Sequence, residues 1–100
     1  MTEEHYKIFE TFGILRDDSV KYAREHYRLS PEDAYDCLQD ATLLAISRGL
    51  DSWESSRLRA YIFGCFKNNC RNRRRRIDFR LKRQEQLILT ARQEYSHLIE

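Results

Sequence analysis

The sequence predicts an all-α fold: a compact bundle of three to four helices with a basic C-terminal helix extension. Only three glycines and one proline occur in 100 residues, so few positions interrupt a helix. Apolar residues recur every three to five positions along much of the chain, as they do on the buried side of a helix. A chain of this length forms one domain with a small core, to which a bound partner would add stability.

The first helix is expected from Glu3 to Arg28, with Gly13 as a candidate break. Its buried side should consist of the apolar residues that recur along it: Ile8, Phe12, Leu15, Val20, Ala23 and Tyr27. If the helix breaks at Gly13, Asp17 and Asp18 could cap a second segment.

The second helix is expected from Pro31 to about Arg48. Ser30 is a favourable N-cap, and Pro31 suits the first helical position because its ring presets φ. Acidic residues at positions 32 and 33 favour the positive end of the helix dipole. Gly49 is expected to end the helix.

At 100° per residue the second helix separates into two faces. The side that should pack inward carries Ala34, Cys37, Leu38, Ala41 and Ala45. The opposite side carries a narrow acidic and polar stripe with one leucine in its middle: Asp36, Gln39, Asp40, Leu43 and Ser47. This stripe is either an ordinary solvated face or a surface for a basic protein partner, with Leu43 as an apolar anchor.

Residues 49–56, GLDSWESS, are polar and turn-prone, so a loop is expected there. The loop contains Trp53, the single tryptophan of the chain. Trp53 either folds back onto the core or forms an aromatic platform on which an unpaired base could stack.

A long third helix is expected from Ser56 through the basic residues that follow. One side carries Leu58, Ile62, Cys65, Phe66 and Asn69. The other side carries Ala60, Gly64, Lys67, Asn68, Arg71 and Arg75. On that side small residues would let a polymer backbone approach, Asn68 could hydrogen-bond base edges, and the cations could pair with phosphates.

Residues 84–100 are expected to form an amphipathic packing or dimerisation helix, or a linker. The pattern behind this expectation is a heptad-like spacing of Leu81, Ile88 and Tyr95 with Gln84, Ala91 and Leu98.

The net charge of +2 conceals a strong segregation of charge along the chain. Residues 1–66 carry eight Lys or Arg against twelve Asp or Glu, residues 67–83 carry nine against one, and residues 84–100 carry one against three. The three segments therefore have charges of −4, +8 and −2. A basic block fused to an amphipathic pattern on an acidic domain typically binds polyanions, so nucleic acid is the expected partner.

The sequence lacks the motifs of several classes of function. There is no G-x-S-x-G, no Walker sequence and no other catalytic constellation, so neither an enzyme nor a cofactor is expected. Cys37, Cys65 and Cys70 lack C-x-x-C spacing, which favours buried, reduced thiols over a metal site. No apolar run is long enough to cross a membrane and no signal segment is apparent, so a cytoplasmic location is expected.

Two segments together resemble the second conserved region of the sigma-70 family, in particular its extracytoplasmic-function branch. Residues 33–46, DAYDCLQDATLLAI, are similar without a gap to the family pattern D-A-E-D-L-V-Q-E-A-F-L-R-A-W. Residues 58–76, LRAYIFGCFKNNCRNRRRR, are similar to the pattern F-R-A-W-L-Y-R-I-A-R-N that leads into an arginine run. The resemblance covers about residues 6–80, so residues 1–83 are expected to form a region 2-like domain.

The resemblance implies a transcription initiation protein that docks on core RNA polymerase and recognises and melts the minus-ten promoter element. In such proteins the second helix binds the clamp coiled coil of the polymerase, and the matching residues here are Asp36, Gln39, Asp40 and Leu43. The following loop and helix hold the melted non-template strand. The DNA-binding residues implied in this sequence are Trp53, Lys67, Asn68, Arg71, Arg74 and Arg75.

Some features depart from the family pattern. Tyr35 stands where glutamate is common, Thr42 where phenylalanine is common, and Gly64 interrupts a helix usually built from stronger helix formers. The sequence also shows no helix-turn-helix domain for the minus-thirty-five element. Either the segment belongs to a longer factor or a second protein supplies the upstream promoter contacts, and an anti-sigma factor is a further candidate partner.

Two other functions stay open. A regulator or inhibitor could occupy the same polymerase surface without initiating transcription, and it would combine the acidic stripe with a non-functional base pocket. A small nucleic-acid-binding protein unrelated to polymerase would instead bind tightly through its basic helix alone.

Overall fold

Three α-helices make up nearly all of the chain. The structure, a computed structural model, describes residues 5–99. The elements follow in the order α1 (Tyr6–Tyr27), α2 (Pro31–Ser47), the 3₁₀ turn η2 (Leu50–Ser52) and α3 (Ser55–Ile99). No strand occurs within these residues, so the predicted all-α fold is confirmed. Among the described helices, none is both long and apolar enough to cross a membrane.

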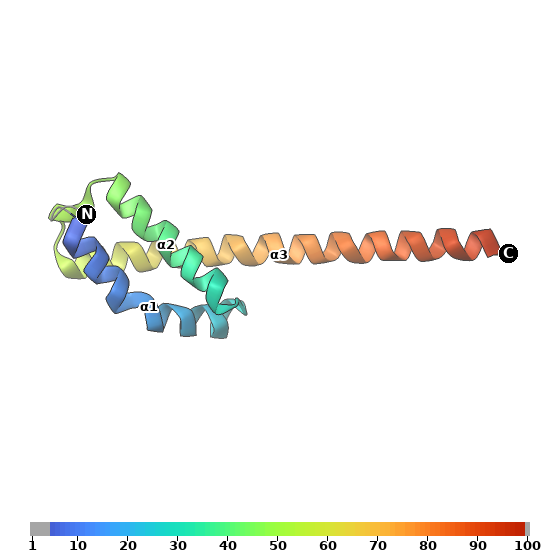
Figure 1. Cartoon of the computed structure of the whole chain (residues 1–100), viewed down its shortest axis with the longest axis horizontal. Helices are drawn as coiled ribbons and strands as arrows, with labels where there is room; N and C mark the ends of the chain where they lie inside the picture. Colours follow the sequence, from blue (N-terminus) through green and yellow to red (C-terminus); the bar gives the residue numbers. More distant parts are fainter. Residues whose placement is uncertain (1–4, 100) are drawn as a thin grey trace.

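α1 remains helical through Gly13, so the candidate break is absent. Its axis changes direction in its middle, as Figure 1 shows. At its C-terminal end Arg28 takes the left-handed conformation (φ 51°) that usually favours glycine. The N–H of Leu29 then donates to the carbonyl of Ala23 (3.2 Å), which closes the helix before α2 begins. The expected start at Glu3 lies outside the described residues.

α2 begins and ends close to its predicted boundaries. The Ser30 hydroxyl accepts a hydrogen bond from the N–H of Asp33 (3.1 Å), and Pro31 takes the first helical position. The helix ends at Ser47, and Gly49 follows with φ 67°, a conformation that costs glycine nothing because it has no Cβ. η2 then lies within the predicted loop.

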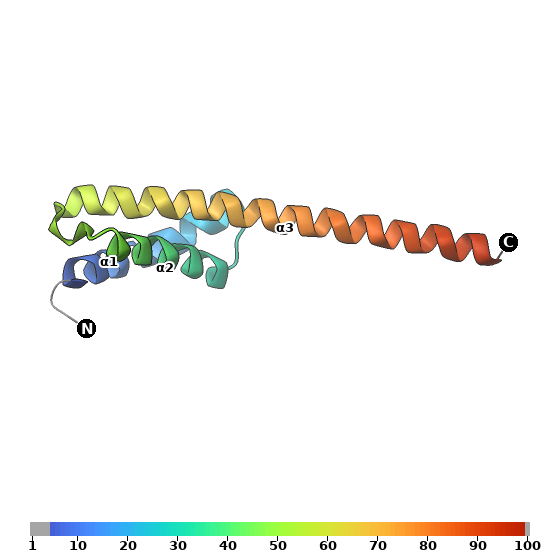
Figure 2. The same cartoon turned by 90° about the horizontal axis from the view of Figure 1, so that it is seen from above.

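α3 has 45 residues. At 1.5 Å per residue it is about 68 Å long, which accounts for the 70 Å length of the molecule. Figures 1 and 2 show α1 and α2 along its first half, while the second half projects alone. Residues 5–77 are termed the head, and residues 78–98, all of which are exposed, are termed the tail. α3 continues without interruption past residue 83, the expected end of the region 2-like domain.

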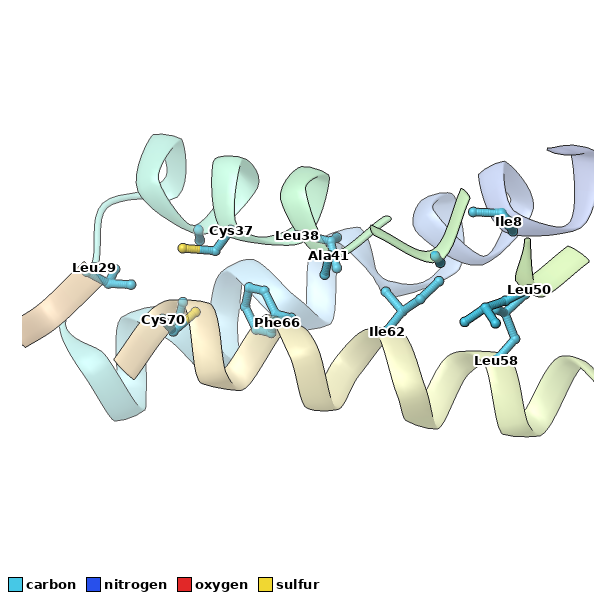
Figure 3. Close-up of a cluster of buried hydrophobic side chains, with 13 residues drawn as sticks. Ile8, Leu29, Cys37, Leu38, Ala41, Leu50, Leu58, Ile62, Phe66 and Cys70 are labelled. Atoms are coloured by element: carbon cyan, nitrogen blue, oxygen red, sulfur yellow. The ribbon is translucent and has the colours of Figure 1, made fainter. Parts of the chain in front are cut away.

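The core lies where α1 and α2 pack on the first half of α3 (Figure 3). Fully buried side chains follow one another at about one-turn spacing on α3: Leu58, Ile62, Phe66 and Cys70. The predicted inward face of α2 is confirmed, and its three alanines let the α2 backbone approach the larger side chains of α3. The predicted apolar side of α1 is also fully or partly buried. On α3 the prediction missed Cys70, whereas Cys65 and Asn69 are only half-buried.

Candidate nucleic-acid and protein interfaces

The side of α3 opposite the core forms an exposed strip along the head. At 100° per residue a narrow arc contains five exposed residues, termed the basic strip: Arg57, Gly64, Asn68, Arg71 and Arg75. Nothing lies within 4 Å of the position that a Cβ on Gly64 would take, so the strip is open at its centre. A polymer backbone could therefore lie along the strip without meeting a protruding side chain at that point.

Four of the six predicted DNA-binding residues lie on the basic strip or at its edge. Asn68, Arg71 and Arg75 are exposed, and neither arginine forms an ion pair with a described residue. Lys67 lies at the edge, half-buried, with its ammonium 5.5 Å from the centre of the Phe63 ring. These cations are free to pair with phosphates.

Arg74 was also predicted to bind DNA, but in the structure it joins α1 to α3. Its Nε and Nη2 donate to Asp78 Oδ1 (3.0 and 2.8 Å), and its Nη1 donates to the carbonyl of Arg28 (3.1 Å). The hydrogen bonds from Arg74 lower the pKa of Asp78. The neighbouring Arg73 pairs with Asp33 at the start of α2 (2.7 Å). Both arginines therefore support the fold, and their guanidinium groups are less available to phosphates than those of the basic strip.

Trp53 lies at the N-terminal end of the basic strip, half-buried against the core. The guanidinium of Arg57 lies 3.9 Å from the centre of the indole ring, and Tyr61 meets the ring edge to face at 5.4 Å. Lys7 Nζ donates to the carbonyl of Trp53 (2.9 Å), which ties this loop to α1. A base that stacked on the face occupied by Arg57 would have to displace that guanidinium or stack upon it.

Trp53 and Asn68 do not share one pocket. Asn68 follows Arg57, the residue that covers Trp53, by eleven positions of continuous helix. Eleven residues of helix span about 16 Å. One flipped base cannot touch both side chains over such a distance, whereas a strand that lay along the basic strip could reach both.

The acidic stripe of α2 is exposed as predicted, with Asp36, Gln39 and Asp40 around Leu43. Leu43 leaves 56% of its surface in solvent. Neither aspartate forms an ion pair with a described residue. The stripe therefore keeps both its carboxylates and its apolar centre available to a partner.

A polar hollow of about 90 Å³ lies between α2 and α3. It is lined by Cys37, Asp40, Asn69, Asn72, Arg73 and Arg76. The Asn69 amide donates to the carbonyl of Cys37 (3.0 Å) and holds the two helices together beside the hollow. Asp40 belongs to both the hollow and the acidic stripe, so the acidic face of α2 adjoins cations of α3. Asn72 and Arg76 were missed from sequence because only the packing of the two helices places them near α2.

The cysteines lie in or near the core, and all three are free thiols. Cys37 and Cys70 are buried between α2 and α3 (Figure 3), and Cys65 is half-buried. The hydrogen bond with Cys37 and burial both raise the pKa of the Cys70 thiol. Among residues 5–99 no cluster of three His, Cys, Asp or Glu side chains could hold a metal ion.

Comparison of the chain with protein-family models, curated proteins and solved structures finds no match. The resemblance to the sigma-70 family therefore depends on the two segments of sequence alone. In the structure these segments form α2 and the first half of α3, and they carry the acidic stripe and most of the basic strip.

Proposed function

We propose that the chain is a sigma-factor-like transcription initiation protein. It docks on the clamp coiled coil of core RNA polymerase through the acidic stripe and holds the melted minus-ten promoter element along the basic strip. One observation carries the proposal: both segments that resemble region 2 contribute buried apolar residues to one core, while Asp36 and Asp40 lie on one exposed face and Arg71 and Arg75 on another.

The acidic stripe suits a basic helix as its partner. Carboxylates that lack partners attract the opposite charge and orient the encounter, while an exposed leucine between them supplies the apolar contact on which affinity depends. Leu43 and its neighbours Asp36 and Asp40 have this arrangement.

The basic strip suits a single strand of DNA. Its arginines can pair with phosphates whatever the sequence, the gap at Gly64 admits the backbone, and the amide of Asn68 can read a base edge. Trp53 offers a stacking surface at the far end of the strip, shared with Arg57.

The docking test compares two charge reversals of equal size on two different helices. Asp36→Lys with Asp40→Lys should weaken the complex with core polymerase by about 2 kcal/mol or more, because it turns attraction into repulsion. Asp17→Lys with Asp18→Lys, on the exposed side of α1, is the matched control and should leave affinity unchanged. Binding is measured by fluorescence anisotropy and initiation by run-off transcription, with helicity checked by circular dichroism. Equal affinities for both double variants would remove the acidic stripe from the interface.

A regulator that occupies the polymerase without initiating is the second candidate. Two observations favour it: the Arg57 guanidinium covers the Trp53 ring, and Trp53 and Asn68 lie too far apart to hold one base. A pocket preformed for a flipped base would show neither feature. Trp53→Ala and Asn68→Ala distinguish the two functions on closed and pre-melted promoters in the presence of polymerase. For an initiation factor each substitution costs about 1 to 3 kcal/mol on the pre-melted template.

A regulator would instead show polymerase binding without run-off RNA, and neither substitution would change its affinity. Tight DNA binding in the absence of polymerase would mark the third alternative, a stand-alone nucleic-acid-binding protein.

A further inference from the structure

The apolar stripe of α3 does not end where the head ends. Beyond the core it continues with alternating steps of four and three residues: Ile77, Leu81, Gln84, Ile88, Ala91, Tyr95 and Leu98. At 100° per residue this line extends the side of α3 that carries Phe66 and Cys70 in the core. α1 and α2 cover that side in the head, but in the tail Leu81 and Ile88 are 50% and 53% exposed.

An uncovered helix of this kind has little to stabilise it. Most of the stability of a helix in a protein comes from packing of its apolar face, and lone helices in water are marginal. Within the described residues nothing packs on the tail, which projects away from α1 and α2 (Figure 2).

We propose that a second copy of the chain covers the tail in an antiparallel two-stranded coiled coil. The heptad spacing supplies the seam, and the seam continues the core of the head. Charge selects the orientation. Residues 67–83 carry nine cations against one anion, and residues 84–100 carry one cation against three anions. A parallel pair would set the two basic blocks side by side, whereas an antiparallel pair sets each block towards the acidic end of the other copy.

In one antiparallel register the tails of the two copies face each other along the apolar stripe. This register places Leu81 opposite Ala91 of the second copy and Gln84 opposite Ile88, and it brings Tyr95 of the second copy to the half-buried Ile77 at the edge of the head. Twofold symmetry repeats each of these layers. Leu81 thereby faces the small side chain of Ala91, and Ile88 faces the flexible side chain of Gln84.

The flanking residues in this register are mostly complementary. Arg80 lies opposite Glu94 of the second copy, and Asp78 lies opposite Arg92, each pair occurring twice. Asp78 can accept this second arginine because both bonds from Arg74 end on Oδ1. Leu87, which is 64% exposed, lies opposite its own counterpart on the symmetry axis and extends the apolar contact.

One flanking residue opposes the pairing and so provides a test. Glu85 lies opposite Glu85 of the second copy, a like-charge pair on the symmetry axis. A parallel dimer would instead pair Glu85 with Arg80 and Gln84 with its counterpart. Glu85 therefore has opposite effects in the two orientations.

The first experiment measures the mass of the full chain by sedimentation and light scattering over a range of concentrations. The wild type should reach twice the monomer mass as concentration rises. Ile88→Glu should weaken association on the order of a hundredfold, because it buries a charge in the seam. Leu89→Glu is the matched control: Leu89 is 55% exposed, as Ile88 is, but lies off the stripe, so this variant should dimerise like the wild type.

A monomeric wild type, or equal behaviour of the two glutamate variants, would overturn the proposal. Circular dichroism and thermal unfolding of the head verify that each variant folds. The proposal does not depend on the proposed function, and both experiments omit polymerase and DNA.

The second experiment tests orientation. Glu85→Gln should tighten the antiparallel dimer, since it removes the like-charge pair. Arg80→Glu should weaken association about tenfold, and adding Glu94→Arg to the same chain should restore it. Weaker association with Glu85→Gln, or no rescue by Glu94→Arg, would show that the copies do not pair in this antiparallel register.

Discussion

Buried hydroxyl groups in the head differ in whether they have a hydrogen-bond partner. Thr11 and Thr42 each donate to the carbonyl four residues earlier, at 2.8 and 2.9 Å. Ser19 is fully buried, and its hydroxyl has no hydrogen-bond partner among the described residues. An unsatisfied buried hydroxyl costs stability, because it gives up its bonds to water without a replacement.

Ser19→Ala is therefore expected to raise the free energy of unfolding by about 1 kcal/mol. Urea unfolding followed by circular dichroism measures the change. Thr42→Val serves as the control, since it deletes a hydroxyl that is hydrogen-bonded and should lower stability or leave it unchanged. A loss of stability in Ser19→Ala would mean that the hydroxyl has a partner, such as a buried water, and that the assignment is wrong.

The arginine run on α3 shows how helical phase divides one kind of residue between two roles. Arg71 and Arg75 point away from the core, without an ion pair among described residues. Arg73 and Arg74 lie between them in sequence but turn towards α2 and α1, where they pair with Asp33 and with the carbonyl of Arg28. Four arginines within one and a half turns of α3 thus divide between an exposed face and contacts that support the fold.

Replacing each of these arginines with glutamine should separate the two roles. Arg71→Gln or Arg75→Gln should lower the salt dependence of complexes of the protein, polymerase and DNA by roughly 0.7 to 0.9 log units per lost phosphate contact, with thermal stability unchanged. Arg73→Gln or Arg74→Gln should lower the free energy of unfolding by about 1 kcal/mol and leave that slope nearly unchanged. DNA titrations at several salt concentrations and urea unfolding provide the two readouts. If all four variants change only the salt dependence, or all four change only the free energy of unfolding, the arginines do not divide between these two roles.

The molecule as a whole consists of a packed head and a solvated rod. α3 runs through both parts. Its first half packs against α1 and α2 to form the core, and its second half has no partner among the described elements (Figure 1). Hydrogen bonds at the surface of a lone helix open easily, whereas those under a packed core open only with global unfolding. Backbone amides along α3 should therefore divide into two classes.

Hydrogen exchange followed by mass spectrometry should show the division. At low protein concentration amides of residues 84–98 are expected to exchange quickly and those of α3 in the head slowly. If a second copy covers the tail, its protection should increase with concentration while that of the head stays constant, and Ile88→Glu should abolish the increase. Tail protection that does not vary with concentration would contradict the coiled coil.

Local rules in the chain were enough to predict the all-α fold, the start of α2 at Pro31, its end before Gly49 and the two faces of α2. Caps and helical periodicity involve residues a few positions apart, so they can be read without knowledge of the fold. The same holds for the exposure of the acidic stripe and of Arg71 and Arg75, because an amphipathic helix turns its charged side to water.

Other features depend on which helix packs against which, and no local pattern contains that information. The bond from Arg74 to the carbonyl of Arg28 at the end of α1 was not predicted, nor was the position of the Arg57 guanidinium over the Trp53 ring. Gly13 lies inside an unbroken helix, since packing of α1 on the other two helices outweighs the low helix propensity of one glycine. α1 ends and α2 begins beside the middle of α3, where Arg74 bonds to Arg28 and Arg73 to Asp33. Beyond Ile77 neither helix covers α3, so the continuous apolar stripe passes there from core to solvent.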